Sequence, residues 1–126
     1  MARSVLLQLA RDSIQEVLEA ARTIDKKKLL QEYPLLGEHI ASTVNIYLDS
    51  ELRGSSSTRI PSYSLIEDII KNAKKAAFED KNFEPISTSE YLNSEIEIIL
   101  VTPEGKISET DPSILKTTSY KISDTF

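Results

Sequence analysis

The chain has 126 residues, a formal net charge of −5, one histidine and no cysteine. This length suits one small domain with a single buried core, and we expect residues 1–126 to form one domain. The missing cysteines exclude disulfides, thiolate metal sites and a cysteine nucleophile, and the negative charge argues against a nucleic-acid partner, because phosphates require a positive surface.

Residues 3–22 are predicted to form an amphipathic helix. Apolar side chains recur there at three- and four-residue spacing, at Val5, Leu6, Leu9, Ala10, Ile14, Val17, Leu18 and Ala21. Polar side chains are expected on the opposite face, at Arg11, Asp12, Gln15, Glu16 and Glu19. The apolar stripe must be buried, most simply against a sheet.

A second, short helix is predicted over residues 26–32, with Asp25 as its N-cap. Tyr33 and Pro34 end this helix, because the residue before a proline avoids the helical region. A strand is predicted over residues 43–48, where the pattern alternates and β-branched and aromatic residues are frequent. The strand is therefore expected to have two distinct faces.

The segment that follows this strand carries the most informative residues. Residues 49–51 are predicted to form a turn, and Leu52 and Arg53 to begin a partner strand. Residues 54–63 are rich in glycine, serine, threonine and proline, a composition typical of a loop. We therefore expect a hairpin that opens into a loop directly after Arg53.

The second main helix is predicted over residues 64–79. Ser64 and Glu67 have the spacing of a capping box, in which the serine hydroxyl and the glutamate carboxylate each accept a backbone N–H. Ser87 and Glu90 repeat this spacing, so a short helical turn is expected there too.

A strand entering a covered sheet position is predicted over residues 95–102, and Lys106 and Ile107 are expected to start a return strand. Glu95 and Glu97 alternate on this strand and so point to the same face. Two interpretations of this pair stay open: a pair that binds a cation or shares a proton, and a solvent-facing strand surface.

These elements predict an α+β fold, with the two main helices packed on a mainly antiparallel sheet. The last residues, 108–126, are expected to be a mobile tail or an edge strand, the latter over residues 117–122. The exposed edge of so small a sheet is also a possible contact for a homodimer.

Three stretches of the chain resemble the AMMECR family in their order and spacing. They are the opening helix Leu6–Ile14, the signature Glu51-Leu52-Arg53-Gly54 after the central strand, and the segment Ala76-Ala77-Phe78-Glu79-Asp80-Lys81-Asn82-Phe83-Glu84-Pro85. The likeness spans residues 4–107. It implies an α+β fold with a sheet flanked by helices. The family's biochemical function is not established, so the resemblance implies no reaction.

The chain departs from the usual pattern of this family in three places. Ser55, Ser56 and Ser57 stand where the family usually has Cys-Ile-Gly, so the suspected reactive thiol is absent. Asn82 stands where an arginine is frequent beside the phenylalanine. The chain also stops before the C-terminal segments usual in the family, which is expected either of a short, divergent member or of a truncated one.

The candidate ligand site surrounds the signature. Its expected residues are Arg53, Gly54, Ser55, Ser56, Arg59 and Asp80, with Ser57 and Thr58 between them. Hydroxyls, backbone amides and two guanidinium groups suit a carboxylate or a phosphate. The alternative is a solvated loop in which Arg53 pairs with Glu51 or Asp80. The glycine and lysine pattern of a nucleotide-binding P-loop is missing.

We therefore expect an AMMECR-like binding or scaffold module, with a protein or a small anion as its partner. The alternatives are an enzyme or enzyme accessory that holds a small anionic ligand at residues 53–59, and a structural subunit of a larger complex. No catalytic, metal-binding or cofactor-binding residues are predicted. No apolar run reaches about 18 residues and no export signal is recognised, so we expect no membrane span and a cytoplasmic location.

Overall fold

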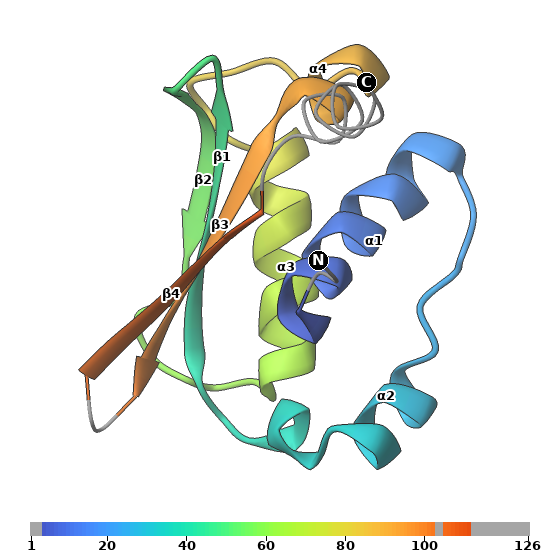
Figure 1. Ribbon diagram of the computed structural model, residues 1–126, viewed down its shortest axis with the longest axis vertical. Coiled ribbons are helices and arrows are strands. Elements are labelled where there is room, and N and C mark those ends of the chain that lie inside the picture. Colours follow the sequence, from blue (N-terminus) through green and yellow to red (C-terminus); the bar gives the residue numbers. More distant parts are fainter. Residues whose placement is uncertain (1–3, 103–104, 112–126) are drawn as a thin grey trace, which may run out of the picture.

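The computed structural model describes residues 4–102 and 105–111 (Figure 1). Its elements in chain order are α1 (Val5–Glu19), α2 (Lys26–Glu32), the 3₁₀ helix η1 (Pro34–Gly37), β1 (Ala41–Leu48), β2 (Glu51–Ser57), α3 (Leu65–Phe78), α4 (Thr88–Asn93), β3 (Glu95–Thr102) and β4 (Gly105–Asp111). The strands form one antiparallel sheet in the order β2-β1-β3-β4. The predicted α+β fold is confirmed.

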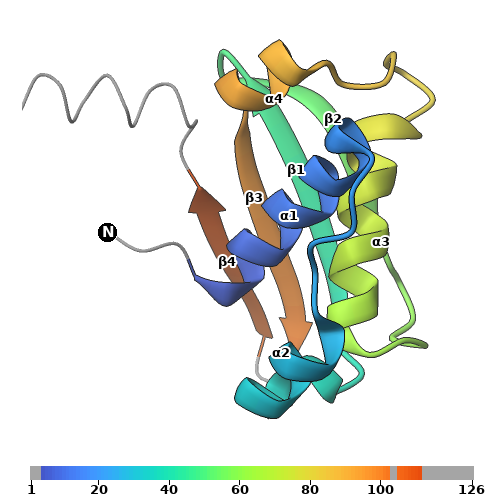
Figure 2. The ribbon, with the colours of Figure 1, turned by 90° about the vertical axis from the view of Figure 1, so that its right-hand side faces the viewer.

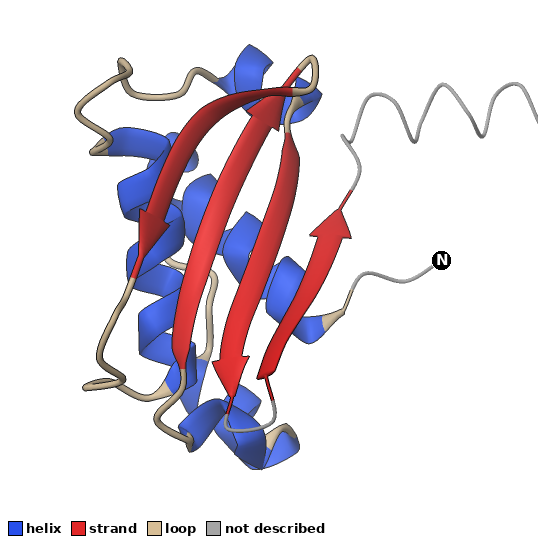
Figure 3. Ribbon diagram, turned by 90° about the vertical axis from the view of Figure 1, so that its left-hand side faces the viewer, coloured by secondary structure: helices blue, strands red, loops and turns tan. Residues whose placement is uncertain are grey.

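The helices lie on one side of the sheet. Helices α1 and α3 pack against the same face (Figures 1 and 2), and no described helix covers the opposite face (Figure 3). The buried hydrophobic side chains form one cluster between the sheet and the helices. Alternate residues of the central strands point into it, among them Val44, Ile46, Ile96 and Ile98.

Helix α1 is shorter than predicted. The Ser4 hydroxyl caps its start by accepting the Leu7 N–H at 3.2 Å. The helix ends at Glu19 because Ala20 adopts a left-handed backbone conformation, with φ of 52°. A left-handed residue commonly ends a helix and is usually a glycine. Because an alanine occupies this position, the end of the helix could not be predicted from the sequence.

Helix α3 lies at the centre of the fold, against both β1 and α1. Its buried apolar residues are Leu65, Ile66, Ile69, Ala73, Ala76 and Ala77, along the predicted stripe. The small alanine side chains at the end of this list allow the helix to approach the sheet closely. This close approach decides the role of Gly54, described below.

One of the two predicted capping boxes forms. Both of its hydrogen bonds are present at Ser87 and Glu90, where α4 begins. The Ser64 side chain makes no capping hydrogen bond at the start of α3, and Glu67 instead lies 3.8 Å from the Lys26 ammonium group. The capping box predicted at Ser64 is therefore wrong.

Strand β2 is longer than predicted, and the prediction of a loop from Gly54 onward is wrong. The strand continues through Ser57, with its three serines paired to residues 43–45 of β1. Glycine and serine suggest a loop by composition, but the pairing partner in the sheet decides whether such a segment forms a strand. The signature therefore lies inside a strand.

The strands near the C-terminus agree with their predictions where the structure describes them. Strand β3 has the predicted bounds, and the return strand expected at Lys106 and Ile107 is β4. Residues 108–111 belong to β4. The edge strand predicted over residues 117–122 lies outside the described residues.

Candidate functional site

Arg53 occupies a β-bulge in β2. Ile46 of β1 pairs with Gly54, whereas Tyr47 pairs with Leu52, so Arg53 is the extra residue of the longer strand. A bulge takes a side chain out of the regular alternation between the two faces of a sheet. The bulge thus lets Arg53 reach the segment that connects α3 with α4.

The Arg53 guanidinium binds groups of the chain itself. Its Nε donates to Glu90 at 2.9 Å, and its Nη2 donates to the second carboxylate oxygen of Glu90 at 3.1 Å. Nη2 also donates to the Glu84 carbonyl at 2.7 Å, and the group lies 5.3 Å from the centre of the Phe83 ring. The Arg53 side chain is 11% exposed. Such a bidentate pair between an arginine and a carboxylate is among the stronger ionic contacts in proteins.

Glu90 belongs to two contacts at once. Its hydrogen bonds with Arg53 and with the Ser87 N–H lower the pKa of the carboxyl group from 4.5 to about 2, against the opposing effect of burial. The Ser87 contact is half of the capping box of α4. Glu90 therefore fastens the first turn of α4 to the bulge in β2.

We expect Glu90→Gln to lower the free energy of unfolding by about 1–2 kcal/mol at neutral pH, a value reduced for the exposure of the pair. The folded-state pKa lies below the unfolded one, so this stabilisation is complete above about pH 5 and is lost as the pH falls toward about 2. Urea unfolding of both proteins at several pH values measures it. A difference that stays constant through this range would contradict the pairing.

Gly54 is required by its distance from α3. A Cβ atom at this position would lie 2.0 Å from the carbonyl oxygen of Ala76, and no real Cβ atom comes so close to another atom. The glycine thus lets the strand and helix approach immediately after the bulge. The glycine of the signature has a structural role here.

Asp80 ties β2 to the segment after α3. One carboxylate oxygen accepts the Ser55 N–H at 3.0 Å, and the other accepts the Asn82 N–H at 2.9 Å. The Ser55 hydroxyl donates to the Asn45 side chain at 2.6 Å. Two of the predicted site residues, Ser55 and Asp80, are therefore in direct contact.

A buried polar network that was not predicted from the sequence joins α3 to β1 and to the end of β2. Asp68 accepts the N–H and the hydroxyl of Ser42 at 2.8 and 2.6 Å, and the hydroxyl of Thr58 at 2.7 Å. Asn72 donates to the Ser42 carbonyl at 3.1 Å and accepts the Ser56 hydroxyl at 2.8 Å. Asp68 and Asn72 lie one turn apart beside the apolar stripe of α3. This spacing of two polar residues was the signal in the sequence that could have indicated the network.

The structure brings some of the predicted site residues together and separates others. Gly54, Ser55 and Asp80 lie side by side, and Arg53 turns to the segment before α4. Arg59 is exposed and follows the other end of β2. Six residues of nearly extended chain span about 20 Å, so the two guanidinium groups do not face a common centre. Anion binding by this segment stays a prediction.

A buried ion pair joins α1 to β4. Arg11 was predicted to face solvent, but it is 1% exposed, so that prediction is wrong. Its Nε donates to Asp111 at 2.6 Å, and its other nitrogens donate to the carbonyls of Tyr91 at 3.3 Å and Ser94 at 2.9 Å. The guanidinium also lies 5.2 Å from the centre of the Tyr91 ring. This contact fastens both ends of the described chain to α4.

The uncovered face of the sheet carries a polar group at its centre. Glu97 of β3 accepts the Asn45 side-chain amide and the Tyr47 hydroxyl, both at 3.0 Å. Burial raises the pKa of Tyr47, and the neighbouring Glu97 carboxylate raises it further. Glu95 shares this face by the alternation of the strand.

Two features are absent from residues 4–102 and 105–111. Within these ranges no three histidine, aspartate or glutamate side chains gather as the ligands of a metal ion. None of the helices described there combines the length and the apolar character needed to cross a membrane.

The fold and the bulged strand define a small α+β domain that carries Leu-Arg-Gly within the edge strand β2. The AMMECR1 family model matches residues 7–121. The chain belongs to the AMMECR1 family, which confirms the resemblance seen in the sequence.

Archaeal relatives support this assignment. The chain is 33% identical over 103 residues to a Pyrococcus furiosus protein, covering 78% of this chain and 48% of that protein. It is 33% identical over 110 residues to a Methanopyrus kandleri protein, covering 85% and 52%. The crystal structure of the uncharacterized protein PH0010 from Pyrococcus horikoshii is similar, with a TM-score of 0.70, 31% identity, and coverage of 78% of this chain and 50% of that one. The chain spans about half the length of the relatives it matches.

Proposed function

We propose that the chain is a protein-binding module that docks a segment of a partner protein on the uncovered face of its sheet. The observation that carries this proposal is the one-sided packing of the described residues, whose helices cover one face of the sheet and leave the other open (Figure 3). A single open sheet face is common in antiparallel proteins, so only the side chains on it can distinguish a docking surface from a solvent-facing one.

Exposed apolar side chains flank the polar centre of this face. Leu52 is 47% exposed and pairs with Tyr47, whose hydroxyl binds Glu97. Val101 is 49% exposed and lies on the same face as Glu97, four residues farther along β3. A partner that covers Leu52 and Val101 would remove their apolar surface from water, and this favours association at this face.

The charges of this face indicate the chemistry of the partner. Glu95 and Glu97 place two carboxylates on it, and the chain as a whole carries a net charge of −5. We expect the docked segment to present apolar side chains to Leu52 and Val101 and a basic or N–H-donating side chain to the carboxylates. The match covers only about half of each relative, so in the relatives this domain lies beside a further protein segment of similar length. We expect such a segment to be a suitable partner for the domain.

Site-specific photo-crosslinking in cells tests this proposal. A photoreactive phenylalanine analogue replaces Val101 on the open face or Ile107 on β4, whose side chain is 55% exposed on the helix-facing side. We expect an adduct of one defined mass from position 101 and none from position 107. Equal adducts from both positions, or no adduct from position 101, would overturn the proposal.

A second copy of this chain is the other occupant that the open face and the edge strands allow. Light scattering across micromolar concentrations distinguishes it, because a homodimer doubles the measured mass whereas a docking module that awaits another protein stays monomeric. The cytoplasmic location expected from the sequence stays a prediction, which fractionation of cells that express the tagged chain would test.

A further inference from the structure

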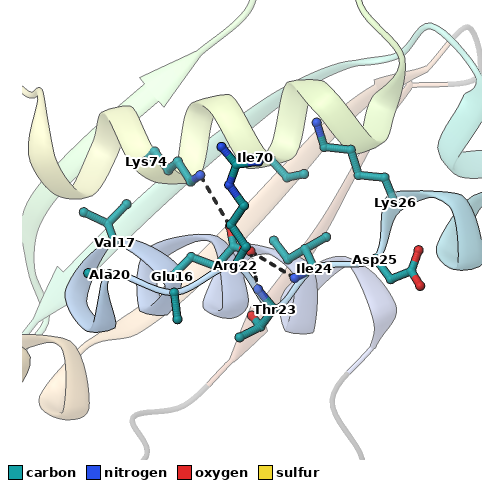
Figure 4. Close-up of a pocket in the computed structure, with 11 residues that line it drawn as sticks. Glu16, Val17, Ala20, Arg22, Thr23, Ile24, Asp25, Lys26, Ile70 and Lys74 are labelled. Carbon is teal, nitrogen blue, oxygen red and sulfur yellow. Dashed lines mark hydrogen bonds and ion pairs between the residues drawn. The ribbon is translucent and has the colours of Figure 1, made fainter.

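We propose that the pocket between the α1–α2 connection and α3 binds a small organic anion that has an apolar body. The pocket has a volume of about 900 Å³ and is lined by residues of α1, the connection and α3 (Figure 4). The elements that line it lie on the helical side of the sheet, away from the open face (Figure 1). Its volume is within the range of small-molecule sites.

The carboxylate of Glu16 holds the connection in place. One of its oxygens accepts the N–H groups of Thr23 and Ile24 at 2.7 and 2.9 Å, and the other lies 3.5 Å from the Lys74 ammonium group. Burial raises the pKa of Glu16, but these donors together outweigh it and lower the pKa below its usual value. The connection is therefore tied to α1 by a charged group that is already engaged, and the pocket beside it is built in advance.

Cationic side chains outnumber the free acids around the pocket. Arg22, Lys26 and Lys74 line it, with Lys74 already paired to Glu16, and Figure 4 shows Arg22 reaching across it toward α3. The second lining acid, Asp25, points away and accepts the Lys28 N–H that caps α2. Lys26 lies 3.8 Å from Glu67 in a pair that is half exposed on both sides, and such a pair contributes little. The local charge therefore favours an anion, although the whole chain is acidic.

The remaining wall of the pocket is apolar. Val17 of α1, Ile24 of the connection and Ile70 of α3 supply it, and Val17 is exposed although it is a large hydrophobic residue. An apolar wall opposite guanidinium and ammonium groups suits a ligand with a hydrocarbon or aromatic body and a carboxylate or phosphate head. Arg22 is placed to bind the head and α3 to pack against the body.

Calorimetric titration with defined probes tests this site. Phenyl phosphate and benzoate supply an aromatic body with either head group, inorganic phosphate lacks the body, and benzyl alcohol lacks the charge. The variants are Arg22→Gln and Lys26→Gln, with Lys27→Gln as the matched control, because Lys27 is adjacent in α2 and does not line the pocket. Thermal unfolding of each variant checks that the fold is intact.

We expect saturable binding of phenyl phosphate or benzoate and weaker binding of the other two probes. Arg22→Gln should raise the dissociation constant about tenfold, as expected for the loss of one charge-assisted contact. Lys27→Gln should change it less than about twofold. The proposal is overturned if neither aromatic anion binds at millimolar concentration, if benzyl alcohol binds equally well, or if Arg22→Gln and Lys27→Gln have the same effect. None of these outcomes bears on docking at the sheet.

Discussion

Arg11→Ala is expected to lower the free energy of unfolding by about 3–5 kcal/mol, the largest effect of any single polar substitution in this fold. The change removes the cation that binds Asp111 at 2.6 Å inside the protein. It also removes the donor to the carbonyls of Tyr91 and Ser94. Breaking one side of a buried pair is costly because the other charge remains in a medium that solvates it poorly.

Urea unfolding of the variant beside the wild type measures this effect. Arg59→Ala makes the same chemical change at an exposed arginine and is expected to alter the free energy of unfolding by less than about 0.5 kcal/mol. A loss below about 1 kcal/mol for Arg11→Ala would contradict the buried ion pair between α1 and β4.

Gly54→Ala is expected to be the most damaging of the small apolar substitutions, with a loss of about 3 kcal/mol. The added Cβ atom would lie 2.0 Å from the Ala76 carbonyl oxygen, so β2 and α3 must separate to admit it. The obstacle is a backbone atom, which no change of side-chain rotamer can move. Thermal or urea unfolding measures the loss.

Gly37→Ala is the matched control for this variant. A Cβ atom at Gly37 would meet its nearest neighbour, a methyl group of Leu30, at an ordinary contact distance of 3.6 Å. The second substitution Ala76→Gly is expected to give no rescue of Gly54→Ala, because it leaves the carbonyl oxygen in place. A rescue, or an equal loss in Gly37→Ala, would contradict the steric role of Gly54.

The repeating patterns of the sequence were sufficient for most of the fold. The stripe on α3 and the alternation in β3 predicted these elements because each pattern is local and has the period of its structure. The left-handed residue Ala20 and the pairing of the three serines were not predictable in this way. Both depend on contacts or conformations that the local residue types do not favour.

The contacts around the signature could not be predicted from the sequence, because they join residues that are distant in the chain. Arg53 and Glu90 are 37 residues apart, and the bulge that brings them together depends on the register between β1 and β2. The sequence suggested two acids closer in the chain as partners. Likewise, Arg11 and Asp111 are 100 residues apart, so the helical pattern alone placed Arg11 among the solvent-facing residues.

The signature thus has a physical role in this chain that needs no thiol. Arg53 fastens α4 through Glu90, and Gly54 allows the contact between β2 and α3. The three serines in place of the usual Cys-Ile-Gly complete the strand, and the hydroxyls of Ser55 and Ser56 bind Asn45 and Asn72. These contacts shape the edge of the sheet whose open face we propose as the docking surface.

The most direct test of this docking surface is photo-crosslinking from position 101 in the background of Leu52→Lys. Leu52 and Val101 lie on the same open face on different strands, so a charged side chain at position 52 should exclude the docked segment without touching the crosslinking position. The account predicts that the yield of the position-101 adduct falls several-fold in this background and is unchanged in Ile60→Lys, an exposed residue after β2. An adduct yield that Leu52→Lys leaves unchanged would contradict it.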